Sequence, residues 1–134
     1  MKKLSIVLIL LFVALSQCLA QKKDINNVAK NSNDSLLQKA LVSIDDKRYF
    51  DAENLLKQAL QKDSTNMKCS YELAWTYYCM QEYKKTINIL TPFTKKDSCS
   101  SDVYQLLGNA YDEMGDKTKA ASVYNEGLLK YNNA

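Results

Sequence analysis

The feature that most constrains this sequence is a pattern of residue types that returns at a fixed interval along the chain. Leu107 aligns with Leu73, and the small residue Gly108 aligns with Ala74 and Ala40. Three windows of equal length follow one another without a gap or an insertion: 33–66, 67–100 and 101–134. A period of about 34 residues is typical of arrays in which a pair of helices is the repeated unit.

The third window shows this unit most clearly. Its first apolar stripe has the three- and four-residue spacing of one helical face: Val103, Leu106, Leu107, Ala110, Tyr111 and Met114. Gly115 follows where a helix would end, because glycine enters the left-handed conformation without a steric penalty. Asp116 can then cap a second helix, whose apolar residues are Ala120, Ala121, Val123, Tyr124, Leu128 and Leu129. The window predicts a helical hairpin, in which the small residues Gly108 and Ala120 allow the two axes to approach closely.

The repeated pattern resembles the tetratricopeptide repeat family. The third window matches the family's pattern at these positions: Tyr104, Leu107, Gly108, Tyr111, Ala120 and Tyr124. The second window keeps Leu73, Ala74 and Tyr77 but has Thr86 where the family has a small residue. The resemblance implies an all-α fold, an α-solenoid of three stacked antiparallel helix hairpins that forms a superhelix.

The sequence also departs from the family's pattern. Lys39 stands where the family prefers leucine, and Gly127 replaces its last alanine. The family's late proline is absent, and other residues occupy its three positions: Ser64, Ser98 and Asn132. Instead, Pro92 lies within the second helix of the second window, where it predicts a kink or an end near Leu90.

The first twenty residues have the pattern of an export signal. Lys2 and Lys3 precede an apolar run over residues 4–15, and Ala20 supplies the small residue required at a cleavage site. The run is shorter than the roughly 18 residues that a spanning helix needs. We expect a signal peptide at residues 1–20, with cleavage between Ala20 and Gln21 and export to the periplasm or the exterior of a bacterial cell.

Two alternatives to this cleavage remain. The stretch that ends at Cys18 resembles a lipobox, which would make the chain a lipoprotein with a lipid anchor on Cys18, although Gln17 fits that pattern poorly. The second alternative is an uncleaved anchor. Residues 21–32 are polar and read as a flexible linker, with a short solvated helix as the other interpretation.

Charge argues against nucleic acid and membrane partners. The chain has 18 basic and 15 acidic side chains, and loss of Lys2 and Lys3 with the signal leaves 18 − 2 − 15, or +1. A balance so near neutral does not steer a protein onto a polyanion. We therefore expect no nucleic acid partner, and no membrane span after the signal is removed.

The sequence predicts no catalytic, cofactor or metal site. It contains no histidine, which removes the commonest general base and zinc ligand, and it has no glycine-rich phosphate loop. Carboxylates such as Asp112 and Glu113 are adjacent in sequence, so that their side chains point in different directions on a helix. We expect a protein that is not an enzyme.

Three cysteines remain after the signal: Cys69, Cys79 and Cys99. An exported chain enters an oxidising compartment, in which disulfides form. Because the start of the first helix of a hairpin lies near the end of the second, Cys69 and Cys99 are the pair that can meet. The alternative is three unbridged thiols, and the sequence leaves both interpretations open because disulfide geometry is strict.

The family resemblance implies a binding surface. In tetratricopeptide arrays the first helix of each repeat lines a concave groove, and the matching positions here give ten candidate groove residues: Leu37, Leu41, Ile44, Tyr71, Trp75, Tyr78, Gln105, Asn109, Asp112 and Glu113. Exposed aromatic residues flanked by polar ones are typical of interaction hot spots, and peptides are natural ligands of such grooves. The alternative interpretation assigns Leu37, Leu41 and part of Trp75 to the core.

These patterns predict a scaffold or adaptor for protein–protein interaction, which binds a peptide segment of another protein in the groove. The acidic third window favours a basic or neutral aromatic-bearing segment over a carboxylate-terminated one. The alternative is a structural subunit that forms a homo-oligomer or docks into an envelope assembly. It would use the third repeat, whose apolar residues no further helix covers: Tyr124, Leu128, Leu129 and Tyr131.

Overall fold

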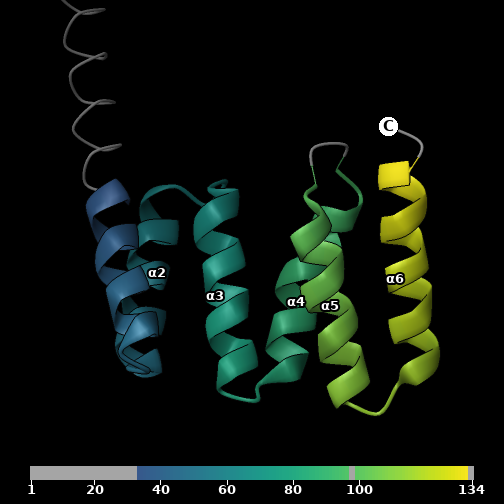
Figure 1. The fold of residues 1–134 in the computed structure, drawn as a ribbon. Helices are drawn as coiled ribbons and strands as arrows, with labels where there is room; N and C mark the ends of the chain where they lie inside the picture. The colour runs from purple at the N-terminus through teal and green to yellow at the C-terminus, as the bar shows by residue number, and fades with distance from the viewer. Residues whose placement is uncertain (1–32, 97–98, 133–134) are drawn as a thin grey trace, which may run out of the picture. The chain divides into compact units, whose positions relative to one another are not determined.

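The computed structural model describes residues 33–96 and 99–132 (Figure 1). The chain divides into two units, Met1–Ser35 and Leu36–Ala134, of which the second contains nearly all of the described residues. The predicted signal peptide, its cleavage site at Ala20 and Gln21, Cys18 and the linker lie outside the described residues.

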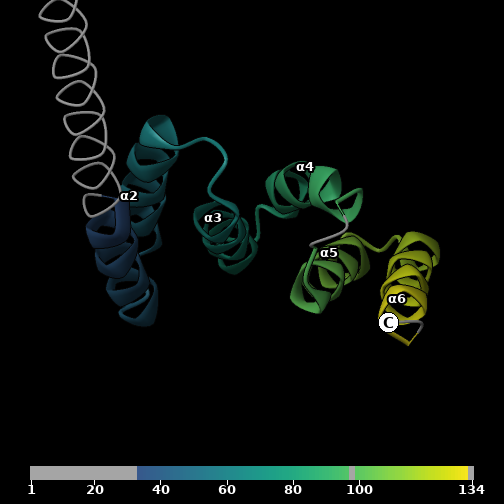
Figure 2. The same cartoon turned by 90° about the horizontal axis from the view of Figure 1, so that it is seen from above.

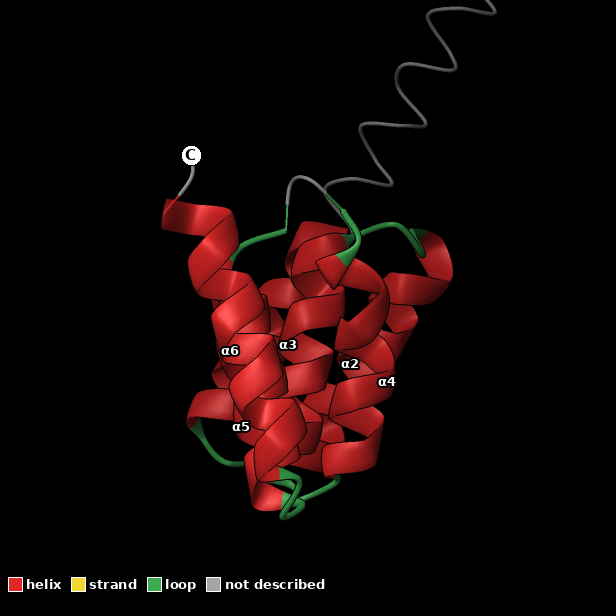
Figure 3. Cartoon of the chain, turned by 90° about the vertical axis from the view of Figure 1, so that its right-hand side faces the viewer, coloured by secondary structure: helices red, strands yellow, loops and turns green. Residues whose placement is uncertain are grey.

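The described residues form helices joined by short turns (Figure 3). Residues 33–45 are helical, and five helices follow: α2 (Tyr49–Lys62), α3 (Met67–Cys79), α4 (Tyr83–Thr94), α5 (Ser101–Glu113) and α6 (Lys117–Asn132). Each of α2 to α5 packs against the helix that follows it, and α3 also contacts α5 (Figures 1 and 2). Within the described ranges no strand occurs, and the predicted all-α solenoid of helix hairpins is confirmed.

The turns within the three described hairpins share one backbone geometry. Lys47, Gln81 and Gly115 occupy the same position in successive repeats, and their φ angles are 60°, 61° and 82°. Each of these residues donates its amide to the carbonyl three residues earlier, at 2.9 Å. The next amide reaches the carbonyl five residues earlier, at 2.7 to 3.0 Å. This pair of bonds is a Schellman motif, which ends the first helix of each hairpin at the same point.

Two buried clusters form the core of the second unit. The first contains Leu37, Ala40, Leu56, Ala59, Cys69, Leu73 and Tyr77. The second contains Ala74, Leu90, Cys99, Val103, Tyr104, Leu106 and Leu107. Leu56 and Leu90 occupy the same repeat position and are both fully buried, the first in a cluster with α3 and the second in a cluster with α5. The first helix of each following hairpin thus covers the hairpin before it.

The two departures in the second hairpin have local explanations. Thr86 is fully buried at the small position, and its hydroxyl donates to the carbonyl of Ala74 at 3.1 Å, which satisfies its polar atom. Of the kink or end predicted near Leu90, the end is wrong, because α4 continues through Pro92 to Thr94, and the kink stays a prediction. Pro92 lies in the last turn, where the one carbonyl deprived of its amide partner belongs to the exposed residue Asn88.

Two glycines set the close packing of α5 against α6. A Cβ atom on Gly127 would lie 2.8 Å from the Cβ atom of Tyr104, and one on Gly108 would overlap the ring of Tyr124. Ala120, the other small residue predicted at this contact, is buried. The absence of larger side chains therefore lets the two tyrosines pack closely against the opposite helix.

Candidate functional site

Three aromatic side chains gather where α3 ends and α4 begins. Trp75 and Tyr78 stack with their ring centroids 5.8 Å apart and an interplanar angle of 18°. Tyr83, the first residue of α4, tilts against Tyr78 at 60° with a centroid distance of 5.4 Å. The spacing of three residues places Trp75 and Tyr78 on one face of α3, and the turn brings Tyr83 back beside them. We call Trp75, Tyr78 and Tyr83 the aromatic patch.

The last residue of α5, Glu113, lies beside the aromatic patch. Burial raises the pKa of Tyr78 and of Tyr83, and the negative charge of Glu113 raises the pKa of both hydroxyls further. Tyr124 of α6 also raises the pKa of Tyr78. Side chains of α3, α4 and α5 therefore lie at this surface, and a tyrosine of α6 acts on it.

A hollow of about 630 Å³ lies at the first hairpin, and one of about 510 Å³ lies between α5 and α6. The second, which we call the α5–α6 hollow, is lined by Ser101, Tyr104, Gln105, Asn109, Tyr124, Gly127, Leu128 and Tyr131. The hydroxyl of Tyr124 donates to Oδ1 of Asn109 at 2.7 Å, and Tyr131 donates to the carbonyl of Cys99. Tyrosine hydroxyls thus fix two sides of this hollow.

The structure brings some of the predicted groove residues together and separates others. Trp75, Tyr78 and Glu113 lie together at the aromatic patch, and Gln105 and Asn109 share the α5–α6 hollow. Asp112 is exposed and pairs with Lys117, whose Nζ atom lies 2.8 Å from Oδ1. Tyr71 packs against the second core cluster.

The predicted groove residues of the first window lie elsewhere. Leu37 is a member of the first core cluster, and Leu41 and Ile44 pack against it. Burial under α3 explains this placement, since Leu73 and Tyr77 of that helix belong to the same cluster. The position agrees with the interpretation of Leu37 and Leu41 as core residues, and their part in binding stays a prediction.

Carboxylates from all three described hairpins act on residues of α3. Burial raises the pKa of Glu72. The positive charge of Lys68 lowers this pKa, and the negative charge of Asp45 raises it. Burial also raises the pKa of Tyr71, and the charge of Asp102 adds to it. Negative charge therefore reaches the face from each of the three hairpins of the described chain.

Sequence reasoning did not find Tyr83, and for binding it named Tyr124 only as an uncovered residue of the third repeat. Both residues lie on second helices, which the family's groove positions do not include. The signal that was available for Tyr83 is its place just after the turn, with Tyr78 just before it. Aromatic residues on both sides of a tight turn are close in space.

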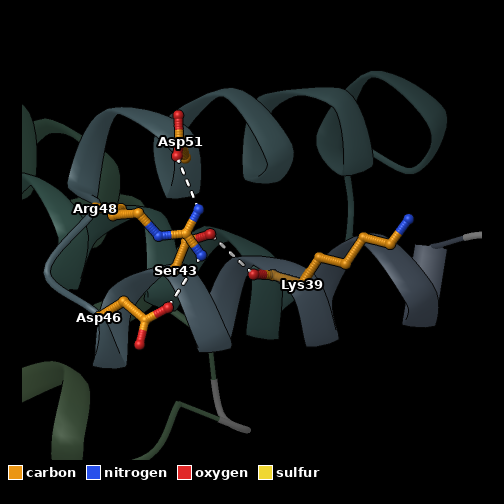
Figure 4. Close-up of polar contacts among 5 residues, drawn as sticks. All are labelled: Lys39, Ser43, Asp46, Arg48 and Asp51. Carbon is orange, nitrogen blue, oxygen red and sulfur yellow. Dashed lines mark hydrogen bonds and ion pairs between the residues drawn. The ribbon is translucent and has the colours of Figure 1, made fainter.

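Charged side chains pair with one another at the first hairpin of the described array (Figure 4). The guanidinium of Arg48 lies between two carboxylates, 3.0 Å from Asp46 and 3.1 Å from Asp51. The hydroxyl of Ser43 donates to the carbonyl of Lys39 at 3.1 Å. These side chains belong to the hollow at the first hairpin or to its rim, where the Arg48 guanidinium and the Ser43 hydroxyl each have a partner.

The predicted disulfide between Cys69 and Cys99 stays a prediction. Both side chains are buried, Cys69 in the first core cluster and Cys99 in the second. Burial raises the pKa of the Cys79 and Cys99 thiols, which keeps both protonated at neutral pH.

Within residues 33–96 and 99–132, no group of cysteine, aspartate and glutamate side chains is arranged to hold a metal ion. None of the helices in the described part of the chain combines the length and the apolar character needed to cross a membrane.

The sequence is similar to a known repeat protein. It is 34% identical over 95 residues to Superkiller complex protein 3 of Homo sapiens, a tetratricopeptide repeat protein. The similarity covers 66% of this chain and 6% of that protein, so that the chain spans a small part of its relative's length. No protein-family model matches the sequence. The similarity and the helix hairpins together support tetratricopeptide-like helical repeats in this chain.

Proposed function

We propose that this chain is a non-enzymatic scaffold or adaptor, which binds a peptide segment of another protein across α3 and α5. The observation that carries the proposal is the aromatic patch, in which Trp75 remains 37% exposed although it is stacked on Tyr78. Rigid, exposed aromatic rings lose little conformational entropy on binding and are typical of interaction hot spots. Helical repeats of this kind provide such surfaces.

The ligand extends from the aromatic patch towards the α5–α6 hollow. Tyr124 links the two regions, because its hydroxyl affects the pKa of Tyr78 and donates to Asn109 inside the hollow. Carboxylates along the face disfavour an acidic segment and favour a neutral or basic one. A peptide several residues long would contact both regions.

We further propose that this binding takes place in the cell envelope of a bacterium, in the periplasm or outside the cell. The support is the sequence of the first twenty residues, with two lysines, an apolar run and Ala20. Intact mass of the protein purified from an exporting host tests the proposal. The mass of a chain that begins at Gln21 supports the proposal, and the mass of an added lipid indicates anchoring through Cys18. The mass of the full-length chain contradicts both the cleavage and the lipid anchor.

Capture of a partner from envelope extract tests the site. Trp75→Ala should lose the partner that the wild-type protein captures, because the substitution removes the exposed ring. Phe50→Ala is the matched control, since Phe50 is an aromatic residue of α2 that is 73% exposed. Circular dichroism confirms that both variants fold. Capture by Trp75→Ala at the wild-type level would contradict the proposed site.

A second function, docking into an envelope assembly, is favoured by the α5–α6 hollow. Tyr124 occupies the repeat position of Leu56 and Leu90, both of which are buried in clusters with the next helix. In the described chain Tyr124 instead lines the hollow beside Leu128, which is 59% exposed. We propose that a helix of a partner protein can occupy this place and pack over Tyr124, in the way that α3 packs over Leu56 and α5 packs over Leu90.

The first hairpin does not suit that place in a second copy of the chain. Where α3 and α5 insert Leu73 and Leu107, the corresponding residue of the first helix is Lys39. A charged side chain would replace a buried leucine, so that head-to-tail homo-oligomers are disfavoured. Sedimentation at high concentration should find a monomer, and a concentration-dependent oligomer would contradict this assignment. Leu128→Glu, inside the hollow, should release an assembly partner, and Trp75→Ala, outside it, should leave that partner bound.

A further inference from the structure

We propose that the aromatic patch is an arginine-binding site, which holds the guanidinium of a partner's arginine against the Trp75 and Tyr78 rings and next to the carboxylate of Glu113. The inference rests on the proposed function, because it names the side chain by which the bound segment is anchored. It assigns a ligand chemistry to this surface.

The partly exposed Trp75 and the half-buried Tyr78 and Tyr83 offer aromatic rings to a cation. Trp75 and Tyr78 are nearly parallel and in direct contact, so that a ligand binds on their outer side and not between them. Tyr83 tilts at 60° to Tyr78 and forms a second wall. Cations are attracted to aromatic faces within about 6 Å of the ring centroid, and tryptophan is the most favourable ring.

Glu113 supplies the countercharge. Its neighbour Asp112 is paired with Lys117 at 2.8 Å. The charge of Glu113 also acts on Lys117, but the ion pairs found within the described residues do not include Glu113. The hydroxyls of Tyr78 and Tyr83 stay protonated, because burial and the charge of Glu113 both raise their pKa. They can therefore donate to this carboxylate and hold it in place beside the rings.

The chain places its own lysines over other rings. Cation–π contacts of 4.9 to 5.8 Å occur in four pairs of described residues: Lys85 with Tyr77, Lys96 with Phe93, Lys119 with Tyr111 and Lys130 with Tyr104. None of these contacts uses a ring of the aromatic patch. The patch combines aromatic rings with a negative charge, and a cation of the ligand can occupy the place that a lysine occupies at the other rings.

Arginine matches this arrangement better than lysine does. A guanidinium is planar, stacks on aromatic rings and donates two parallel hydrogen bonds to one carboxylate, whereas an ammonium acts as a compact charge. Glu72 and Asp102 add negative charge along the same face, which attracts a basic segment before contact. The expected ligand is therefore a segment with one arginine that is flanked by neutral residues.

The single tryptophan of the chain reports on this site directly. Three short capped peptides of glycine and serine, with arginine, lysine or glutamine at the centre, are titrated into the full protein while Trp75 emission is recorded. We expect a saturable change with the arginine peptide, about fivefold weaker affinity for the lysine peptide and no saturable change with the glutamine peptide. Equal affinity for the arginine and glutamine peptides would overturn the proposal.

A variant pair tests the role of the carboxylate. Glu113→Gln should weaken the arginine peptide about tenfold, because it removes a charge-assisted hydrogen bond. Glu126→Gln, at an exposed glutamate of α6, should leave the affinity unchanged. Unchanged affinity in a folded Glu113→Gln protein would refute the site as drawn.

The two proposals fail separately. If Trp75→Ala loses its partner while no arginine peptide binds, the peptide surface stands and its arginine anchor is wrong. If the arginine peptide binds but Trp75→Ala still captures the partner, the cation site stands and the partner binds elsewhere.

Discussion

Gln81 adopts the same left-handed backbone conformation as Gly115 at the equivalent turn of the next repeat, with φ angles of 61° and 82°. Lys47, at the equivalent turn of the preceding repeat, has a φ angle of 60°. A side chain in this conformation costs about 1 kcal/mol, which glycine avoids. The fold therefore keeps its turn geometry in two hairpins where the local sequence opposes it, because the packing of the helices on each side requires it.

This relationship predicts opposite effects of similar substitutions. Gln81→Gly should raise the free energy of unfolding by about 0.5 kcal/mol, since relief of the strain outweighs the greater freedom of glycine in the unfolded chain. Gly115→Ala should lower it by about 1 kcal/mol. Gln105→Gly, within α5, is the control and should lower it by about 1 kcal/mol. Urea unfolding measures all three, and a loss of stability in Gln81→Gly would contradict the account of the turn.

The contact between α5 and α6 predicts a sharp response at Gly127. Gly127→Ala should lower the free energy of unfolding by about 1 to 3 kcal/mol, because the new methyl group would meet the Cβ atom of Tyr104 at 2.8 Å. Ser122→Ala adds no atom at an exposed position of the same helix and should change it by less than about 0.5 kcal/mol. Thermal unfolding distinguishes the two variants. Equal melting temperatures would show that α5 and α6 can move apart at Gly127 without a loss of stability.

A pH effect should follow from the contact between α2 and α3. Glu53 accepts hydrogen bonds from Lys57 at 2.6 Å and from the hydroxyl of Tyr77 at 2.8 Å. The bond from Lys57 is the larger cause that lowers the pKa of Glu53 below its ordinary value of 4.5. The pKa of Glu53 is therefore lower in the folded protein than in the unfolded chain. The stabilisation is complete above the ordinary value of 4.5 and is lost as the pH falls through the folded pKa.

The measurement is urea unfolding at neutral pH and at several values below the ordinary pKa of glutamate. The wild-type protein should lose stability across this range, and Glu53→Gln should lose less, since its side chain does not titrate. Glu126→Gln controls for the loss of one carboxylate at an exposed site. The same acid-induced loss in wild type and Glu53→Gln would exclude this contact as its source.

Much of the fold follows from the sequence. The repeat period predicted the helix hairpins, Gly115 takes the left-handed conformation expected of it, and the carboxylate of Asp116 caps α6 by accepting from the amide of Lys119 at 3.0 Å. Lys47 and Gln81 gave no such signal, because a residue with a side chain is not a marker of this conformation. The helix end at Pro92 was misplaced because proline is tolerated in a last turn that faces solvent.

The candidate site is less visible in the sequence than the fold. Trp75 and Tyr78 follow from the repeat positions, but Tyr83 and Tyr124 lie on helices that those positions leave out. Leu37 illustrates the opposite error, since a residue on a groove position becomes part of the core once α3 covers it. Which residues a neighbouring helix covers depends on the packing of three helices, and one repeat considered alone does not show it.

The most direct test of the central claim, that the aromatic patch binds a protein segment, is photocrosslinking in the exporting host. A photoreactive phenylalanine analogue replaces Tyr83 in one protein and the exposed Phe50 in another, and adducts are identified by mass. We predict a discrete adduct from position 83 with another polypeptide and none from position 50. Adducts from position 50 alone, or none from position 83 while the protein still captures its partner, would contradict the account.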